Sequence, residues 1–289
     1  MIDKALMRRI IAIRKQAGSI IDSMESVASA ELVSLLDGVT QTMERLLTAG
    51  TIDEETVAVL ARLVDGAQER GADIIADLAG GIFDVSLEST VRIADQFSTL
   101  SPRRLASMTQ TFSDGFRVDL LVDGHARWYE ELGRTALAPH RGLRNGLFAA
   151  QAEGRPLDQA VAAMLKADPG ISSLPQNWAS ENLSYEARAR MVIRTESTRV
   201  DNIVSVGFAE SAGITKFANV GVGDERQSEV CRIASEADPM TIEQWTRYRQ
   251  NGLYIGTAPR HPNCRCQLMG VFTGFEPSES LLREAGVIQ

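Results

Sequence analysis

Hydrophobic residues recur every three or four positions through the first half of the chain, which is the spacing that places them on one face of an α-helix. The first series consists of apolar residues at helical spacing: Ile2, Leu6, Ile10, Ile13, Ala17 and Ile21. A second series spans residues 31–50 and ends at Gly50, and a third has its apolar face at Val57, Leu60, Leu63 and Val64. This pattern predicts successive amphipathic helices over residues 1–150.

Polar residues at the starts of two of these segments match helix-capping patterns. Thr51 is followed three residues later by Glu54, as in a capping box. Ser101 precedes Pro102, and proline is favoured at the first position of a helix. We therefore expect one helix to begin just after Thr51 and another just after Ser101.

Beyond residue 150 the pattern becomes mixed. A short helix is expected within 153–170, followed by a loop and by a long helix that starts after Ser184 and stops near Gly213. Residues 214–223 are rich in β-branched residues and glycine and predict a strand, and residues 264–272 predict a second strand. Between them, Thr241 and Gln244 have capping spacing at the start of a short helix that ends at Gly252.

These elements define the expected organisation of the chain. The fold class is mostly α, with a small α+β domain towards the C-terminus. The expected domains are a helical N-terminal region over 1–150, an α+β domain over 151–275 and a C-terminal tail helix over 276–289.

Composition narrows the possible functions. The chain has 289 residues and a formal net charge of −8, which disfavours general DNA binding because that needs a basic surface. It contains no run of about 18 apolar residues, so no membrane span is expected. Its three cysteines are an odd number, so we expect no fully paired disulfide framework and a reducing environment.

All three cysteines and one histidine lie close together in the sequence: Cys231, His261, Cys264 and Cys266. Four nitrogen and sulfur ligands would complete a tetrahedral structural zinc site, whose binding energy would help a small domain to fold. Two other interpretations stay open. The cysteines could form a packed, metal-free clasp, because Cys264 and Cys266 would share one face of a regular strand. Cys264 and His261 could also form a nucleophile dyad.

A second group of polar residues lies on the predicted long helix, in the sequence RTESTR that begins at Arg194. Glu196 and Arg199 have the i,i+3 spacing of an ion pair, and Arg194 shares a helix face with Thr198. The group is either a surface ion pair or a buried polar network that positions the loop carrying His261. A glutamate near a Cys/His site could also act as a general base, which keeps an enzyme hypothesis open.

Three segments of the chain follow one another in the order ARMVIRTESTRV, VGDERQSEVC and PRHPNCRCQL. This series resembles the phage head morphogenesis family, the Mu F-like minor head proteins, over about residues 150–275. In that family an Arg-Thr-Glu helix precedes an Asp-rich turn and a cysteine, and a His-Pro-x-Cys-Arg-Cys segment closes the domain. The matching residues are Arg194, Thr195, Glu196, Asp224, Cys231, His261, Pro262, Cys264, Arg265 and Cys266. The family often has Cys-x-x-Cys where this chain has Cys231 and Ala234.

The resemblance implies a structural minor capsid protein of a tailed bacteriophage or a phage-derived particle, without enzymatic activity. Such a protein would be made in the host cytoplasm and would lie in the virion head at the portal vertex, in several copies around the portal. Its expected partners are the portal protein and the major capsid protein or scaffold, with packaged DNA contacted only indirectly. The region 1–150 would dock on the portal or capsid.

The resemblance also implies roles for individual residues. Zinc, if present, would be structural and held by the Cys/His group. The remaining matched polar residues would form a structural network: Arg194, Thr195, Glu196, Asp224 and Arg265.

Two alternative functions stay open. A metal-dependent hydrolase or nuclease would use Glu196, Asp224 and His261 near a zinc ion. An internal protein ejected with the DNA would use the amphipathic stretch 2–21 at a membrane or channel surface.

Overall fold

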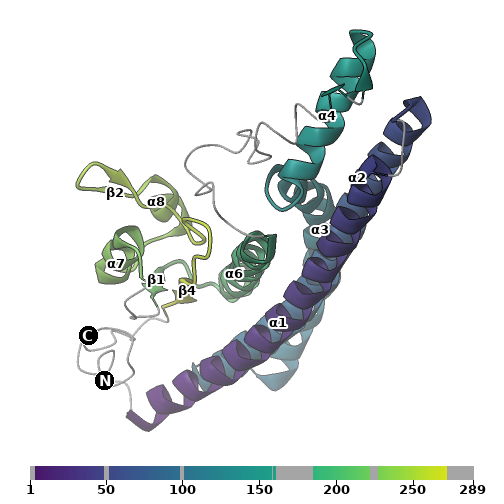
Figure 1. Ribbon diagram of the computed structural model, residues 1–289. Coiled ribbons are helices and arrows are strands. Elements are labelled where there is room, and N and C mark those ends of the chain that lie inside the picture. The colour runs from purple at the N-terminus through teal and green to yellow at the C-terminus, as the bar shows by residue number, and fades with distance from the viewer. Residues whose placement is uncertain are drawn as a thin grey trace. The chain divides into compact units, whose positions relative to one another are not determined.

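The computed structural model describes residues 4–48, 52–97, 101–157, 159–160, 185–221 and 227–271. Its long helices are α1 (Lys4–Thr48), α2 (Glu54–Phe97), α3 (Pro102–Arg134) and α6 (Tyr185–Ser211), and its shorter helices are α4 (Ala138–Ala152), α7 (Glu229–Glu236) and α8 (Ile242–Arg247) (Figure 1). The strands are β1 (Phe217–Val220), β2 (Arg249–Gln250), β3 (Leu253–Tyr254) and β4 (Gln267–Gly270). The predicted fold class, mostly α with a small strand-containing part towards the C-terminus, is confirmed.

Contacts within the chain define two compact units. Unit 1 consists of Met1–Glu25, Leu78–Leu121 and Arg194–Gln289, and unit 2 consists of Ser26–Asp77 and Val122–Ile193. Helices α1, α2, α3 and α6 each contribute a stretch to both units, so neither unit is one continuous segment of sequence. The division at residue 150, which falls inside α4, stays a prediction.

The start of α2 differs from the capping box predicted at Thr51. The helix begins at Glu54, and the preceding Asp53 provides the cap. Its carboxylate accepts hydrogen bonds from the Thr56 backbone N–H at 2.9 Å and from the Thr56 hydroxyl at 2.7 Å. A carboxylate is a stronger acceptor than a hydroxyl and is favoured at the positive end of a helix, so the prediction of Thr51 as the N-cap is wrong.

Two other predicted helix starts are confirmed. Helix α3 begins at Pro102, and the Ser101 hydroxyl accepts from the Arg104 backbone N–H at 3.4 Å. Helix α8 has a complete capping box, in which the Thr241 and Gln244 side chains each accept from the other residue's backbone N–H.

The end of α8 is not where the sequence predicted it. The helix stops at Arg247 instead of Gly252, and β2 and β3 pair as an antiparallel hairpin. Its turn is made by Asn251 and Gly252, with φ of 52° and 79°. Asn-Gly tolerates positive φ at both central positions and is the preferred two-residue hairpin turn, so this dipeptide marks a strand connection.

The two predicted strands of the C-terminal part are present but shorter than expected. Strand β1 pairs antiparallel with β4, and Phe217 lies opposite Gly270. Cys264 and Cys266 precede β4, so they do not share a strand face. The other edge of β4 is covered by α6: Asn202 Nδ2 donates to the Cys266 carbonyl at 2.9 Å, and Asn202 Oδ1 accepts from the Leu268 N–H. The amide thus supplies the pairing that a neighbouring strand would otherwise provide.

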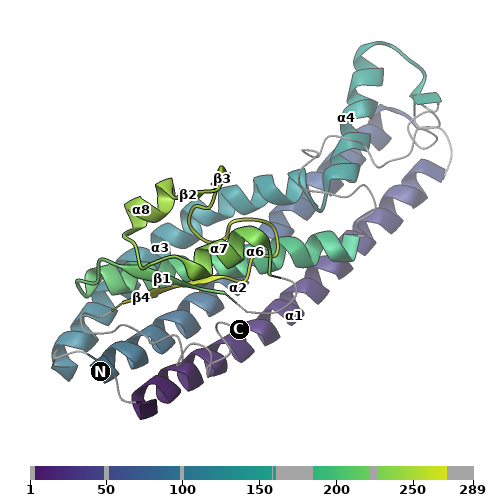
Figure 2. The same ribbon diagram turned by 90° about the vertical axis from the view of Figure 1, so that its left-hand side faces the viewer.

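Residues 214–221 and 227–271, here called the C-terminal module, surround a small core beside α6 (Figure 2). Phe217 and Trp245 are fully buried in it. The Trp245 indole N–H donates to the Phe217 carbonyl at 2.8 Å, which satisfies its polar atom within an apolar environment. The remaining buried members of this core are Ala209, Ile214, Ile233, Ala234, Ile255 and Leu268.

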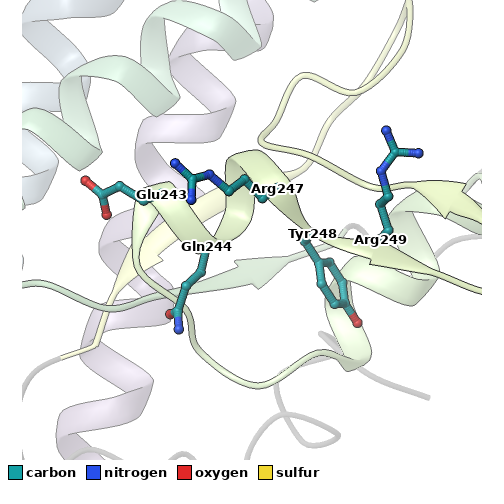
Figure 3. A pocket seen from close by; sticks show the side chains of 5 residues that line it. All are labelled: Glu243, Gln244, Arg247, Tyr248 and Arg249. Carbon is teal, nitrogen blue, oxygen red and sulfur yellow. The ribbon is translucent and has the colours of Figure 1, made fainter.

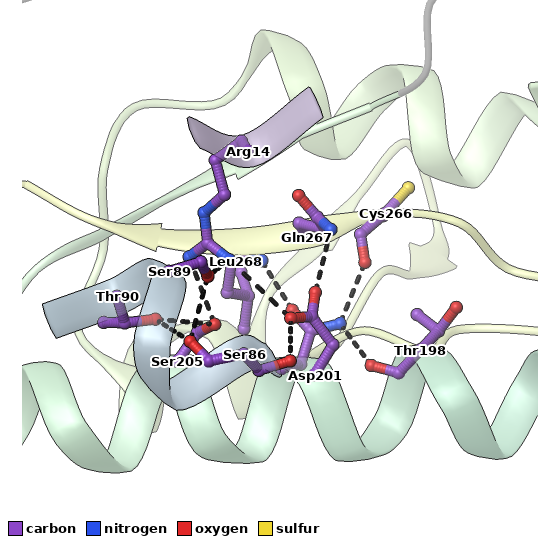
Figure 4. Close-up of polar contacts among 11 residues, drawn as sticks. Arg14, Ser86, Ser89, Thr90, Thr198, Asp201, Ser205, Cys266, Gln267 and Leu268 are labelled. Carbon is purple, nitrogen blue, oxygen red and sulfur yellow. Dashed lines mark hydrogen bonds and ion pairs between the residues drawn. The ribbon is translucent and has the colours of Figure 1, made fainter. Parts of the chain in front are cut away.

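A buried polar network joins the module to helices of unit 1 (Figure 4). Asp201 on α6 is 4% exposed and accepts from the Ser86 hydroxyl at 2.6 Å and the Gln267 side-chain amide at 2.8 Å. Arg14 lies 3.6 Å from the same carboxylate and donates to the Ser205 hydroxyl at 3.1 Å. These bonds satisfy a charge that would be costly to bury alone, and they tie β4 to α1, α2 and α6.

Unit 2 is a helical assembly with an apolar core. Its fully buried residues include Leu32, Leu36, Leu60, Val64, Trp128 and Leu132.

Other predictions from the sequence concern unit 1 and the remaining segments. The described part of the first predicted apolar face is buried in unit 1, at Ile13, Ala17 and Ile21. Among the described residues, no helix is both long enough and apolar enough to cross a membrane. The predicted tail helix at 276–289 and most of the predicted helix at 153–170 lie outside the described residues.

Candidate metal centre

Cys231 is positioned by the first turn of α7. The preceding Ser228 is the N-cap, with an extended backbone, and its hydroxyl accepts from the Cys231 backbone N–H at 3.3 Å. Serine is among the most favoured N-cap residues. This start places the Cys231 side chain on the buried face of α7, together with Ile233 and Ala234.

Cys264 and Cys266 lie in the loop that leads into β4. A tight turn at Pro262–Asn263 closes through the Cys264 N–H, which donates to the His261 carbonyl at 3.1 Å. Asn263 has a φ of 60°, a left-handed conformation that asparagine tolerates better than most residues. Both cysteines are buried.

One face of α6 holds this loop through three polar side chains. Thr195 Oγ1 accepts from the Asn263 N–H at 3.0 Å, and the Thr198 hydroxyl donates to the Cys264 carbonyl at 2.6 Å. Asn202 binds the Cys266 carbonyl, as described above. Residues three and four apart lie on the same face of a helix, so α6 presents the three side chains in a row to successive residues of the loop.

The three cysteines form one buried cluster that could hold a metal ion. Their sulfur atoms all lie within 4.8 Å of one another, and Cys231 Sγ is 3.8 Å from Cys264 Sγ. No disulfide joins them. Cys231 Sγ is also 3.1 Å from Nε2 of His261. The structure thus brings together the three cysteines of the predicted metal group, from α7 and from the loop before β4, and places His261 beside one of them, Cys231.

The His261 ring has a defined orientation. Its Nδ1 lies 2.7 Å from the Pro262 carbonyl oxygen, which can only accept, so Nδ1 carries the proton. Nε2 is then an acceptor for the Ser228 hydroxyl, which lies 2.8 Å away, and it also lies close to Cys231 Sγ. A histidine whose second nitrogen donates to a backbone carbonyl is the usual arrangement of a metal-ligating imidazole.

The cluster favours one thiolate. Hydrogen bonds from the Cys264 and Cys266 thiols lower the pKa of Cys231, and the positive charge of Arg260 lowers it further. The hydrogen bond with Cys231 raises the pKa of Cys266. A thiolate is the form of cysteine that binds metal, so the binding of an ion here would release the protons of the other thiols.

The other predicted polar residues were expected to form a structural network, and the described ones have separate surroundings. Arg194 pairs with Glu25 on α1, with Nε donating to Oε2 at 2.8 Å. Glu196 is buried and accepts from Arg199 Nε at 3.1 Å. Arg265 lies in the cysteine loop itself and is half-buried. Asp224 lies outside the described residues.

Three residues of the site were missed from the sequence: Asn202, Ser228 and Arg260. Ser228 stands at an N-cap position before Glu-Val-Cys, a signal that could have been recognised. Arg260 donates to Asn219 Oδ1 at 2.8 Å and to the Gly256 carbonyl at 3.1 Å, and its guanidinium lies 5.4 Å from the centre of the Trp245 ring. Nothing in the local sequence pattern distinguishes this arginine from an exposed one.

A shallow surface hollow of about 480 Å³ lies on α8 and β2. It shares no lining residue with the cysteine cluster. It is lined by Glu243, Gln244, Arg247, Tyr248 and Arg249 (Figure 3). The lining contains no cysteine, histidine or serine, so it offers neither a nucleophile nor a metal-ligand set of the kind seen in the cluster.

A second group of potential metal ligands occurs in unit 2. Glu69 and Asp73 on α2 lie near His125 on α3, with His125 Nε2 3.1 Å from Asp73 Oδ1. Both carboxylates are exposed. A hydrogen bond between surface side chains accounts for this arrangement, and the buried cysteine cluster is the candidate functional site.

Comparison with known proteins identified no relative of this chain. No family model, curated protein or solved structure matches the chain. The similarity to the phage head morphogenesis family therefore stays a resemblance of sequence motifs.

Proposed function

We propose that Cys231, His261, Cys264 and Cys266 bind one structural zinc ion that closes the C-terminal module. The supporting observation is the geometry of the cluster. Tetrahedral zinc with Zn–S bonds of about 2.3 Å places two sulfur ligands about 3.8 Å apart, and Cys231 Sγ and Cys264 Sγ are 3.8 Å apart. His261 Nε2 lies 3.1 Å from Cys231 Sγ, and the bond of Nδ1 to the Pro262 carbonyl leaves Nε2 as the nitrogen that can bind a metal.

The donor set favours a structural role over a catalytic one. Three sulfurs and one imidazole nitrogen fill all four positions of a tetrahedral ion, whereas catalytic zinc sites keep one position for water or substrate. Glu196, the general base of the hydrolase hypothesis, is 4% exposed and engaged by Arg199. Its carboxylate is therefore committed to an ion pair on α6.

A zinc-closed module on long helices suits a protein that acts by assembly. In our proposal the chain is a minor head protein at the portal vertex of a tailed phage or a phage-derived particle. This assignment is supported by the ordered series of motifs, and by the way α6, the Cys231 turn and the cysteine loop combine into one clasp. The portal protein and the major capsid protein or scaffold are its proposed partners.

The zinc proposal is tested by metal analysis of the purified chain. We expect about one zinc per chain in the unaltered protein and a large loss in Cys264→Ala, which removes a ligand without burying a hydroxyl. Substitution of the exposed Arg232 of α7 by alanine is the matched control and should keep the metal. A metal-free protein that is fully folded would contradict the proposal.

The head assignment is tested separately. Particles from a lysate of the source strain are separated on a density gradient, and each fraction is analysed by quantitative mass spectrometry. The chain should co-sediment with heads and with portal-containing procapsids, in few copies relative to the major capsid protein. Its absence from both kinds of particle would reject the assignment and leave the zinc proposal untouched.

A further inference from the structure

Arg188 on α6 is a buried arginine that has no partner among the residues that the structure describes. It lies in unit 2 and is 6% exposed. Its Nε atom is fully enclosed and has no acceptor, and among the described residues Arg188 forms neither a hydrogen bond nor an ion pair. Arginine is rarely buried to this extent unless paired, because an unpaired charge in the interior costs several kcal/mol.

The neighbouring ionisable group does not compensate the charge. His140 on α4 is 5% exposed, and its Nε2 is 2.9 Å from the Thr40 hydroxyl oxygen. That hydroxyl donates to the Leu36 carbonyl, so Nε2 is the donor to Thr40. Burial, followed by the positive charge of Arg188, lowers the pKa of His140 to about 4. The ring is neutral at neutral pH, so within the described part of the chain nothing offsets the charge of Arg188.

The first turn of α4 adds to the positive potential. His140 is the third residue of this 15-residue helix, and the N-cap Leu137 provides no side-chain acceptor. The aligned peptide dipoles place a partial positive charge at this end. The Ala138 N–H already donates to the Thr135 carbonyl, and Pro139 has no N–H. The helix therefore contributes its field, while the guanidinium of Arg188 contributes the hydrogen-bond donors.

We propose that Arg188 and the first turn of α4 bind a small oxyanion, a phosphate or carboxylate group, in unit 2. A planar guanidinium matches two oxygens of such a group with two parallel N–H donors. The anion would supply the counter-charge that the described residues lack. This site is independent of the zinc proposal and of the head assignment.

The test is the thermal unfolding of the full, metal-loaded chain in chloride buffer, with sodium phosphate or sodium acetate added at constant ionic strength. We expect a millimolar oxyanion to raise the unfolding midpoint by about 2 °C or more, since a ligand that binds only the folded state stabilises it. Arg188→Met should abolish this shift, and Arg188→Lys should reduce it. Arg190→Met, which changes an exposed arginine two residues away, should keep it.

The stability of the Arg188 variants also separates a binding role from a purely structural role, because the two roles predict changes of opposite sign. In chloride buffer, Arg188→Met should be at least as stable as the unaltered protein, because it removes an uncompensated charge. A less stable Arg188→Met, an equal phosphate shift in that variant, or no shift with either oxyanion would overturn the proposal. A shift with phosphate alone would identify a free phosphate group as the ligand. A shift with acetate alone would identify a carboxylate, as on a partner chain.

Discussion

Unit 2 and the C-terminal module are stabilised in different ways. In unit 2, long helices bury large apolar side chains such as Leu36, Leu60 and Trp128 completely. Among the described residues, the C-terminal module contributes seven buried residues to a core that it shares with Ala209 of α6, and it has two short helices and strands of two to four residues. A core of this size contributes little stability after the cost of ordering the chain. In our proposal the module therefore depends on its cysteine cluster and on polar bonds from α6, whereas unit 2 depends on its apolar core.

The largest expected effect comes from removal of the proposed zinc ion. Chelation of zinc, or Cys264→Ser, should destabilise the module by more than about 4 kcal/mol, because apparent binding free energies of structural zinc are about 10–16 kcal/mol. Hydrogen exchange measured by mass spectrometry should show loss of protection in β1 and β4, while the α1–α4 stretches of unit 2 stay protected. Cys264→Ala also removes the ligand and should destabilise the module as much as Cys264→Ser does. If packing alone mattered, alanine would be tolerated better than serine.

Two outcomes would break the comparison. If Cys264→Ser folds with unchanged stability, the cluster does not hold the module together. If chelation exposes unit 2 to exchange as fast as the module, the two regions do not differ in their dependence on the metal.

The converse experiment destabilises unit 2 and leaves the module intact, by the substitution Leu36→Ala. Leu36 is fully buried, and truncation of a buried leucine costs about 2–5 kcal/mol through lost burial and the cavity left behind. Exchange should rise in unit 2, and the zinc content should stay at the unaltered value. Substitution of the exposed Val27 by alanine, on the same helix, is the matched control and should change little. Loss of zinc in Leu36→Ala would show that the regions are coupled.

A smaller effect is expected when the α6 clasp, meaning the bonds from Thr195, Thr198 and Asn202 to the cysteine loop, is weakened while the four proposed metal ligands are kept. Asn202→Ala would leave the Cys266 carbonyl and the Leu268 N–H without their partner, at about 1–3 kcal/mol for each buried group. Zinc should still bind, but with a faster release to a competing chelator. Asn202→Asp keeps the acceptor for Leu268 and loses the donor to Cys266, so its effect should be intermediate. An unchanged release rate in Asn202→Ala would show that the clasp does not position the ligands.

The same contrast explains how much could be predicted from the sequence. The long helices were recognised because apolar spacing and capping residues are local signals, as at Pro102, and the same signals gave the start of α8 at Thr241. The first two predicted segments form one helix, α1, and α7 was not predicted. The start of α2 was misplaced by two residues because Thr51 and Asp53 both fit capping patterns, and only the folded geometry decides between them. The hairpin at Asn251 was missed because the preceding helix was extended to the next glycine.

The candidate site could be predicted only in part, for a physical reason. Cys231, His261, Cys264 and Cys266 stand out by residue type, and metal-ligand chemistry depends on type. Asn202 has an ordinary polar side chain on a long helix, and its role arises only because the fold brings it to a loop 64 residues away in sequence. The buried charge of Arg188 could not be predicted either, since its burial depends on how the helices of unit 2 pack.

Measured for each pH unit, the smallest of the expected effects is a pH dependence of unit 2 that the module should not share. His140 has its pKa lowered to about 4 in the folded chain, mainly by burial and then by Arg188, against about 6.5 in the unfolded chain. The stability from the neutral ring is complete above pH 6.5 and is lost as the pH falls towards 4, because only the unfolded state takes up the proton there. The loss should total about 3.5 kcal/mol, at about 1.4 kcal/mol per pH unit over the interval between the two pKa values. Urea unfolding followed through exchange in α4 should show this slope in the unaltered chain and a flatter one in His140→Gln.

Arg188→Met removes the neighbouring cation and should therefore move the lower end of this pH interval, set by the folded-state pKa of His140, to higher pH. Identical slopes in the unaltered chain and His140→Gln would show that other groups cause the acid sensitivity of unit 2.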